Sequence, residues 1–177
     1  MGRGPSGRSS ATILNQGNPL SLTIVTLSDR PDLLATVATW VYEQWWSHLP
    51  EHSAATLANM LSERRTSDHI YESFVALLDS VPVGTATVLD HDVDTERRPD
   101  LTPWVAAVYV IPEARRQGIG EQLVSQATAF AQSKGFRTVY LWTTDGRNWY
   151  ERLGWQLLEQ FDSNGALVSF LKFERAT

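Results

Sequence analysis

Residues 108–124, VYVIPEARRQGIGEQLV, join three kinds of local sequence. A β-branched apolar run is followed by a proline, two arginines and two glycines separated by one residue, and then by an amphipathic run. This order predicts a strand, a basic glycine turn and a helix. A turn of this kind either reverses the chain or holds an anion, because glycines let a phosphate approach the unpaired N–H groups of the helix start. The candidate phosphate-binding residues are Arg115, Arg116, Gln117, Gly118, Ile119 and Gly120.

Two familiar nucleotide-binding motifs do not fit this turn. It lacks the third glycine of the dinucleotide fingerprint, and it lacks the Gly-Lys-Ser/Thr ending of a nucleoside triphosphate loop. An unrelated α/β protein that binds ATP or NAD is therefore the weakest alternative.

The segments around this stretch alternate between strand and helix patterns. Apolar residues at three- and four-residue spacing predict a helix over residues 33–46, with Trp40 and Trp45 on its core face. Strands are expected at 22–27, 71–78, 85–89, 102–111, 138–143, 155–161 and 166–173, and further helices at 54–64, 118–133 and 145–154. This order predicts an α+β (mixed α/β) fold in one domain, residues 21–177, after a flexible leader at residues 1–20.

Composition narrows the class of protein. The chain has 177 residues, 42% of them hydrophobic, which suits one domain with a real core. Without cysteine, it can form neither disulfides nor a cysteine-linked intermediate. A net charge of −5 disfavours a nucleic-acid partner and favours a cationic one. No apolar run approaches the roughly 18 residues of a membrane span, and no histidine pair has metal-ligand spacing. We expect a cytoplasmic protein with no membrane, nucleic-acid or metal partner.

Two segments carry a family resemblance. VYVIPEARRQGIG resembles motif A of the GCN5-related N-acetyltransferase (GNAT) superfamily, Gln/Arg-x-x-Gly-x-Gly/Ala after a strand that ends near a proline. About thirty residues further on, NWYERLGW is similar to the end of the family's motif B. The matching positions are Arg115, Gly118 and Gly120 in motif A, and Trp149, Tyr150, Gly154 and Trp155 in motif B. With the element order, the resemblance covers roughly residues 22–173.

The resemblance implies a fold and an acyl donor. It implies a central, twisted, mostly antiparallel sheet of about six to seven strands flanked by helices, with acetyl-coenzyme A in a splay between two central strands. Motif A amides would hold the pyrophosphate, and the backbone at Val108 and Val110 would line the pantetheine arm. The Val110 amide would polarise the thioester carbonyl, and Tyr150 would protonate the departing thiolate. A buried core tyrosine with a satisfied hydroxyl is the alternative for Tyr150.

Motif B departs from the family pattern at two positions. Many members have an asparagine seven residues before the tyrosine and an alanine four residues before it, where this chain has Thr143 and Gly146. A hydroxyl of Thr143 or Thr144, or the amide of Asn148, would replace the asparagine contact to the cofactor. The altered segment is loosely similar to the branch that acetylates the N-terminus of actin, but so short a match does not imply an actin substrate.

The sequence says less about the residues that would bind and deprotonate the acceptor amine. The strand before motif A carries no carboxylate that could take a proton from the acceptor amine. Asp92 and Asp94 lie in the nearest acidic segment, which is otherwise a solvated loop of turn-forming residues. Aromatic faces bind cations, so Trp46 and Trp104, together with His48, complete the candidate substrate residues. Core packing is the alternative for tryptophans at helical spacing, more so for Trp40 and Trp45 than for Trp46.

These expectations define one main function and one alternative function. The chain is expected to be an acetyl-coenzyme A-dependent N-acetyltransferase that moves an acetyl group directly onto a primary amine of a small molecule or peptide in a ternary complex. A non-catalytic acyl-coenzyme A sensor or interaction module on the same fold is the alternative. The apolar segments LLEQF and ALVSFLKF at the C-terminus would suit an edge strand that pairs in a homodimer.

Overall fold

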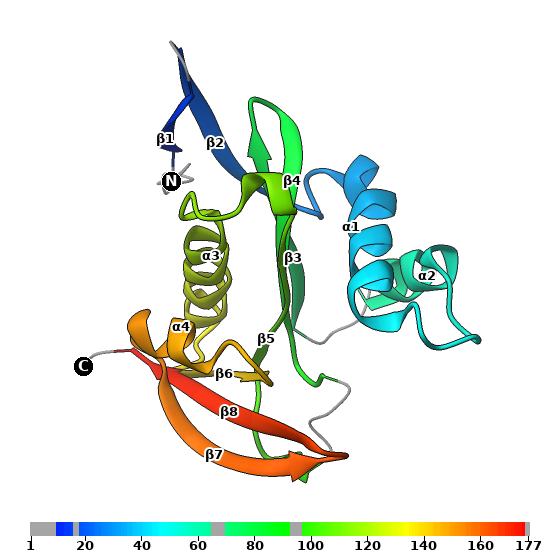
Figure 1. Cartoon of the computed structure of the whole chain (residues 1–177), viewed down its shortest axis with the longest axis vertical. Coiled ribbons are helices and arrows are strands. Elements are labelled where there is room, and N and C mark those ends of the chain that lie inside the picture. Colours follow the sequence, from blue (N-terminus) through cyan, green and yellow to red (C-terminus); the bar gives the residue numbers. More distant parts are fainter. Residues whose placement is uncertain (1–9, 16–17, 65–69, 93–96, 176–177) are drawn as a thin grey trace, which may run out of the picture.

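The computed structural model describes residues 10–15, 18–64, 70–92 and 97–175. Helices cover both faces of one sheet, with α3 and α4 on one face and α1 and α2 on the other (Figure 1). The strands are β1 (Ser10–Asn15), β2 (Asn18–Thr26), β3 (Tyr71–Leu78), β4 (Val81–Leu89), β5 (Trp104–Val110), β6 (Thr138–Thr143), β7 (Gln156–Ser163) and β8 (Ala166–Glu174). The helices are η1 (Pro31–Leu33), α1 (Leu34–Val41), η2 (Tyr42–Trp46), α2 (Ala54–Arg64), η4 (Pro112–Ala114), α3 (Ile119–Ser133) and α4 (Arg147–Arg152).

The sheet has the expected mixed, mostly antiparallel character. Its strand order is β1-β2-β3-β4-β5-β6-β8-β7, and β5 and β6 form the one parallel pair among the described strands. It has eight strands rather than six to seven, because residues 10–15 and 18–20, expected in the flexible leader, belong to β1 and β2. The overall composition of the leader hid the β-forming run ATIL at residues 11–14.

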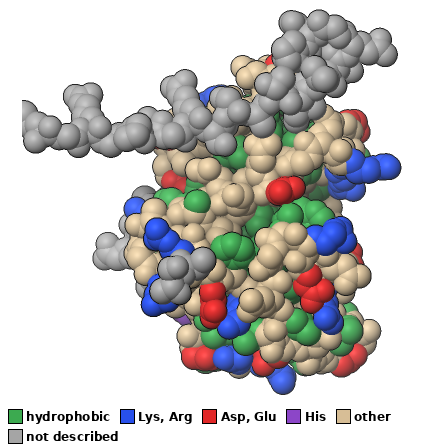
Figure 2. Space-filling model, turned by 90° about the vertical axis from the view of Figure 1, so that its left-hand side faces the viewer, with side chains coloured by type: hydrophobic (Ala, Val, Ile, Leu, Met, Phe, Trp, Pro, Cys, Tyr) green, Lys and Arg blue, Asp and Glu red, His purple; other side chains and the backbone are tan. Residues whose placement is uncertain are grey.

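The two faces of the sheet carry two apolar clusters. On β3, Phe74 and Ala76 pack in the cluster that contains α3, whereas Val75 and Leu77 pack in the cluster that contains α1. Successive strand residues point to opposite faces, so these near-continuous apolar runs are covered on both sides. Figure 2 views the α3 side and shows acidic and basic side chains interspersed over it. No helix in the described ranges combines the length and apolarity needed to cross a bilayer.

The two C-terminal strands form the expected hairpin. Asn164 and Gly165 both have positive φ, of 54° and 83°, at its turn, which is the conformation that a two-residue hairpin requires. β7 is the edge strand of this pair and β8 lies inside the sheet between β6 and β7. Of these two strands, only β7 is therefore placed to pair with another strand; β1 is the edge strand at the other side of the sheet.

β5 and β6 separate soon after they meet. They pair at Trp104 and Tyr140, where the Tyr140 amide donates to the Pro103 carbonyl at 2.9 Å. β5 continues to pair with β4 as far as Val110, whereas no further residue of β5 pairs with β6. This confirms the expected splay between two central strands.

A β-bulge shapes β5 beside the splay. The β4–β5 register shifts between Thr85 and Thr87, and Ala107 on the opposite strand has a φ of 51°, which is rare for a residue with a side chain. Bulges of this kind re-aim side chains and are over-represented next to active sites. Gly84 faces the strand beyond the bulge, where an added Cβ would lie 2.7 Å from the Tyr109 carbonyl oxygen. A glycine is needed there so that the backbone can approach.

Candidate active site

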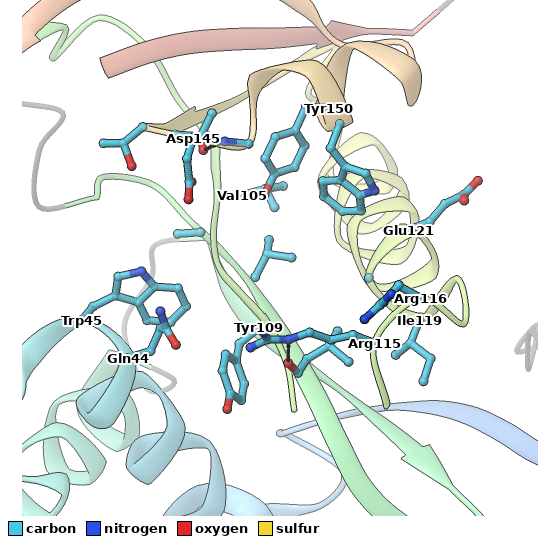
Figure 3. Close-up of a pocket in the computed structure, with 18 of the residues that line it drawn as sticks. Gln44, Trp45, Val105, Tyr109, Arg115, Arg116, Ile119, Glu121, Asp145 and Tyr150 are labelled. Atoms are coloured by element: carbon cyan, nitrogen blue, oxygen red, sulfur yellow. Dashed lines mark hydrogen bonds between the residues drawn. The ribbon is translucent and has the colours of Figure 1, made fainter. Parts of the chain in front are cut away.

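A cleft of about 720 Å³ opens where β5 and β6 separate. Four structural pieces line it: the C-terminal half of β5, the turn before α3, the segment from the end of β6 into α4, and the π-helical turn η2 (Figure 3). Its described lining residues include Gln44, Trp45, Val108, Tyr109, Val110, Arg115, Arg116, Gly118, Ile119, Gly120, Glu121, Trp142, Thr143, Thr144, Asp145, Gly146, Trp149 and Tyr150. The cleft therefore joins the two motif segments that lie far apart in the sequence.

The turn before α3, residues 115–120, lies at one end of the cleft and is the candidate anion cradle. Arg116 and Gly118 both have left-handed φ, of 59° and 75°, and α3 begins immediately afterwards at Ile119. Left-handed residues in such a turn aim neighbouring backbone N–H groups at a common point, and a helix start adds unpaired N–H groups and partial positive charge. No side chain caps α3. The residues of this turn could therefore hold a pyrophosphate.

Arg115 ties the cradle to the end of β5. Its Nε donates to the Val110 carbonyl at 2.8 Å, and its guanidinium lies 5.9 Å from the centre of the Tyr109 ring (Figure 3). The Arg115 side chain thus braces the turn against the strand. Of the two cradle arginines, Arg116 is the one whose side chain has no such bond to β5 among the described residues.

The backbone of Val110 is turned toward the gap between β5 and β6. The Ile111 amide donates to the Val83 carbonyl at 2.9 Å, which makes that pair a hydrogen-bonded pair of the antiparallel ladder. Such pairs alternate with non-bonded pairs, so Val110, opposite Gly84, directs its N–H and carbonyl away from β4. Arg115 donates to the Val110 carbonyl, whereas Val108 lies beside the bulge at Ala107 and has no partner in the β4–β5 register. The Val110 amide therefore faces the gap, the orientation needed for the role that the family resemblance implies for it.

Tyr150 lies on α4 with its ring directed into the cleft (Figure 3). Its side chain is 9% exposed and packs between Trp149 and Trp155, whose ring centres are 4.7 Å and 6.1 Å away. Burial, and then the negative charge of Asp145, raise the pKa of the Tyr150 phenol far above its ordinary value. Its hydroxyl forms no hydrogen bond within the described ranges, unlike that of a satisfied core tyrosine. The group therefore remains protonated and able to donate.

The departures from motif B have a steric basis. Thr143 Oγ1 accepts from the Gly146 amide at 2.9 Å, which closes the turn between β6 and α4. A Cβ on Gly146 would lie 2.9 Å from that same oxygen and 3.1 Å from Cε2 of Tyr150. The alanine of the family pattern would therefore collide with this turn, and threonine with glycine is the compatible combination.

Gly146→Ala is expected to lower kcat about tenfold, because the added methyl displaces the Tyr150 ring or breaks the Thr143 turn. Steady-state kinetics would measure the change, and titration with coenzyme A should show a much smaller effect because the cradle lies on another element. An unchanged kcat would show that the placement of Tyr150 by this turn does not matter.

The other end of the cleft is formed by Gln44, Trp45 and Asp145, which sequence reasoning did not select. Trp45 is 37% exposed, whereas Trp46 packs against the α1 core and lies 4.5 Å from the ring of His52. Trp45, expected in the core, is therefore the exposed tryptophan, and Trp46, expected at the acceptor, is the one that packs against the core. Helix α1 ends at Val41 and continues as a π-helical turn, whose wider spacing shifts the core face from Trp45 to Trp46.

Other predicted residues lie away from the cleft. Trp104 is fully buried, bonded through Nε1 to the Leu101 carbonyl and packed on Phe170, so it cannot contact an acceptor. His48 and Asn148 are exposed and do not line the cleft. Gln117 lies within the turn before α3 but does not line the cleft, whereas Arg116 and Gly118 on either side of it do.

The acidic segment after β4 is described only in part. Asp92 reaches the cleft indirectly, because its Oδ2 accepts from Nε1 of Trp142 at 2.8 Å and Trp142 lines the cleft. Asp94 lies outside the described residues. Asp92 therefore contacts a residue that lines the cleft and is not itself among the lining residues.

Known proteins share this architecture. The structure of yncA from Salmonella typhimurium with acetyl-CoA aligns with a TM-score of 0.66 and 19% identity, over 86% of this chain and 93% of that one. A structure of aminoglycoside 6'-N-acetyltransferase complexed with coenzyme A aligns with a TM-score of 0.67 and 14% identity, over 85% and 96% of the two chains. At such low identity these alignments establish the fold.

Sequence similarity establishes the family. The chain is 30% identical over 132 residues to N-alpha-acetyltransferase 80 of Mus musculus, a match that spans 73% of this chain and 40% of the mouse protein. Residues 34–155, well over half of the chain, match the model of the Acetyltransferase (GNAT) family. The protein therefore belongs to the GNAT family of acetyltransferases, as the two sequence motifs predict.

Proposed function

We propose that the protein is an acetyl-coenzyme A-dependent N-acetyltransferase that transfers the acetyl group directly to a primary amine while both substrates are bound. One observation carries the proposal: a single cleft contains the glycine turn before α3, the Val110 amide turned toward the gap and a protonated tyrosine. The names of relatives agree with it, since one is an N-alpha-acetyltransferase and two structures contain acetyl-CoA or coenzyme A.

The cleft fits the donor along its whole length. The N–H groups at the start of α3, with the side chain of Arg116, would hold the pyrophosphate. Val108 and Val110 would hold the pantetheine arm at the edge that β5 leaves unpaired, in the manner of an added strand. The bound thioester supplies an activated acyl group. The cradle and the strand fix that group between Val110 and Tyr150.

Two groups of the chain would act on the reaction. The Val110 N–H would donate to the oxygen that gains negative charge during attack, which is typically the largest single catalytic contribution. The Tyr150 hydroxyl would donate its proton to the departing sulfur, and a positioned acid of this kind contributes about 10²- to 10⁴-fold. Direct transfer suits the chain, because it contains no cysteine to carry the acetyl group.

The competing function is a sensor that binds acyl-coenzyme A without turnover. Such a protein needs the turn before α3 but has no use for a tyrosine hydroxyl that points into the cleft and has no hydrogen-bond partner among the described residues. The placement of this hydroxyl favours the enzyme.

Thiol release from acetyl-coenzyme A, followed with DTNB across alkyl amines, polyamines, aminoglycosides and short peptides, tests the proposal. The absence of cysteine removes the protein's own background signal. We expect release with at least one class of amine. Calorimetric binding of acetyl-coenzyme A without release from any amine would support the sensor, and the absence of binding would exclude both functions.

A further inference from the structure

We propose that Asp145, Trp45 and Gln44 form a cation-binding site for the acceptor, so that the enzyme selects primary amines next to positive charge and rejects amines next to carboxylates. The inference rests on the proposed function and adds the class of acceptor. None of the three occupies a defining position of either motif, although Asp145 lies within the motif B segment.

Asp145 is placed between the reacting end of the cleft and its opening. It follows β6 directly after Thr143 and Thr144, lines the cleft and is exposed. In the view of Figure 3 it lies between Trp45 and Tyr150, on the side of Tyr150 that faces away from α3. Its carboxylate forms no ion pair or hydrogen bond within the described ranges, so it is available to a ligand. Its charge also raises the pKa of Tyr150, which places the carboxylate within electrostatic reach of the hydroxyl.

Trp45 supplies an aromatic surface across the cleft. Its ring contacts Tyr109 edge-on at 6.4 Å between centres, and Trp40 braces the other side of Tyr109 at 5.8 Å. This support fixes an indole that is otherwise one-third exposed. A cation held between an indole face and a carboxylate gains both cation–π and charge attraction. Gln44, the preceding residue in η2, adds an amide that can accept from an ammonium.

The cationic residues of the cleft lie at one end of it, where Glu121 of α3 is also among the lining residues. Its two described cationic lining residues, Arg115 and Arg116, belong to the turn before α3, and Arg115 is bonded to the Val110 carbonyl. The acceptor end carries the carboxylate of Asp145, and no Lys or Arg is among its described lining residues. An acceptor with a carboxylate beside its amine would therefore meet like charge, whereas a second cationic group would be attracted.

Asp145 also precedes α4, so acceptor binding must be distinguished from a purely structural role at the start of this helix. An acidic residue just before a helix favours the helix dipole, and its loss would disturb Tyr150 for every acceptor equally. A binding role predicts an effect that depends on the charge of the acceptor. The test therefore compares acceptors of matched length and different charge.

The experiment measures kcat/KM for agmatine, n-pentylamine and 5-aminopentanoate with the wild type and with Asp145→Asn. In the wild type we expect agmatine to exceed 5-aminopentanoate by at least about tenfold. Asp145→Asn should raise KM for agmatine about three- to tenfold, leave KM for acetyl-coenzyme A unchanged and bring the agmatine to 5-aminopentanoate ratio close to one. Asp145→Glu should restore part of the ratio, and Trp45→Leu should lower it. Glu113→Gln makes the same charge change at an exposed residue outside the cleft, and it should leave the ratio at its wild-type value.

Each outcome separates this inference from the proposed function. Turnover with an unchanged ratio in Asp145→Asn, or an equal loss for all three acceptors, overturns the cation site and leaves the enzyme standing. A lack of turnover for these three amines when other amines react also overturns the cation site. The absence of turnover with every amine overturns both proposals.

Discussion

Tyr150→Phe is expected to lower kcat about 10²- to 10³-fold while the dissociation constant for acetyl-coenzyme A stays within about twofold of the wild-type value. The change removes only the hydroxyl, and the ring remains packed between Trp149 and Trp155. Because that hydroxyl has no partner within the described ranges, its removal costs the fold nothing. The departing thiolate then lacks a proton donor. Steady-state kinetics and calorimetry of the same preparation measure the two quantities.

Tyr140→Phe is the matched control for this prediction. Tyr140 lies on β6 and packs against Trp104, but it does not line the cleft. Its substitution should leave kcat unchanged. If Tyr150→Phe also retains full activity, another group protonates the leaving sulfur and Tyr150 is a packing residue.

The raised pKa of Tyr150 also predicts the shape of the pH profile. A phenol whose pKa lies above its ordinary value keeps its proton to higher pH, so activity should not fall through tyrosine deprotonation below pH of about 10. At low pH the rate should fall because the acceptor amine is protonated. A wild-type decline between about pH 8 and 9 that Tyr150→Phe abolishes would contradict this assignment.

Gly118→Val is expected to weaken coenzyme A binding about 10- to 100-fold, the cost of losing one or two charge-assisted hydrogen bonds. Gly118 has a φ of 75° at the residue that precedes α3, and a β-branched residue is strongly disfavoured there. The turn must rearrange to relieve the strain, and its N–H groups then no longer converge on the pyrophosphate. Calorimetric titration with coenzyme A checks the prediction.

Gly135→Val provides a control at the other end of the same helix. Gly135 has a φ of 98° directly after α3, and an added Cβ meets nothing within 4 Å at either glycine. Both variants should therefore lose a similar free energy of unfolding, about 1–2 kcal/mol. Only Gly118→Val should lose affinity. Equal affinity in the two variants would mean that the turn is a chain reversal and not the pyrophosphate site.

Local patterns predicted most of the fold because each is decided by neighbours in the chain. Alternating apolar runs gave the β3–β4 and β7–β8 hairpins, and three- and four-residue spacing gave α1, α2 and α3. The segment DSVPVG predicts a tight turn containing Pro82 between the strands at 71–78 and 85–89. The β3–β4 hairpin instead turns at Asp79 and Ser80, both with positive φ, and Pro82 lies inside β4. A proline marks a turn only as a tendency, whereas the strand register fixes which two residues reverse the chain.

The acceptor end depended on contacts that local patterns do not encode. A π-helical turn after Val41 exchanged the roles of Trp45 and Trp46, and helical spacing alone gives no sign of it. Trp104 is an aromatic residue beside the motif, but it is buried against Phe170 of β8, which lies two strands away from β5 in the sheet. Whether an aromatic side chain is core or binding surface is decided by the elements packed over it.

The sequence by itself determined the family and predicted the turn before α3 and Tyr150 as site residues, because motif A and motif B require particular residues at fixed spacing: glycine where φ is positive and a tyrosine on a short helix. Only the tertiary structure decided the acceptor end of the cleft. Gln44 and Trp45 are separated from Asp145 by about a hundred residues, and they line one cleft because β5 and β6 diverge after Trp104. Proximity of this kind arises from sheet topology and strand divergence, which no short stretch of sequence contains.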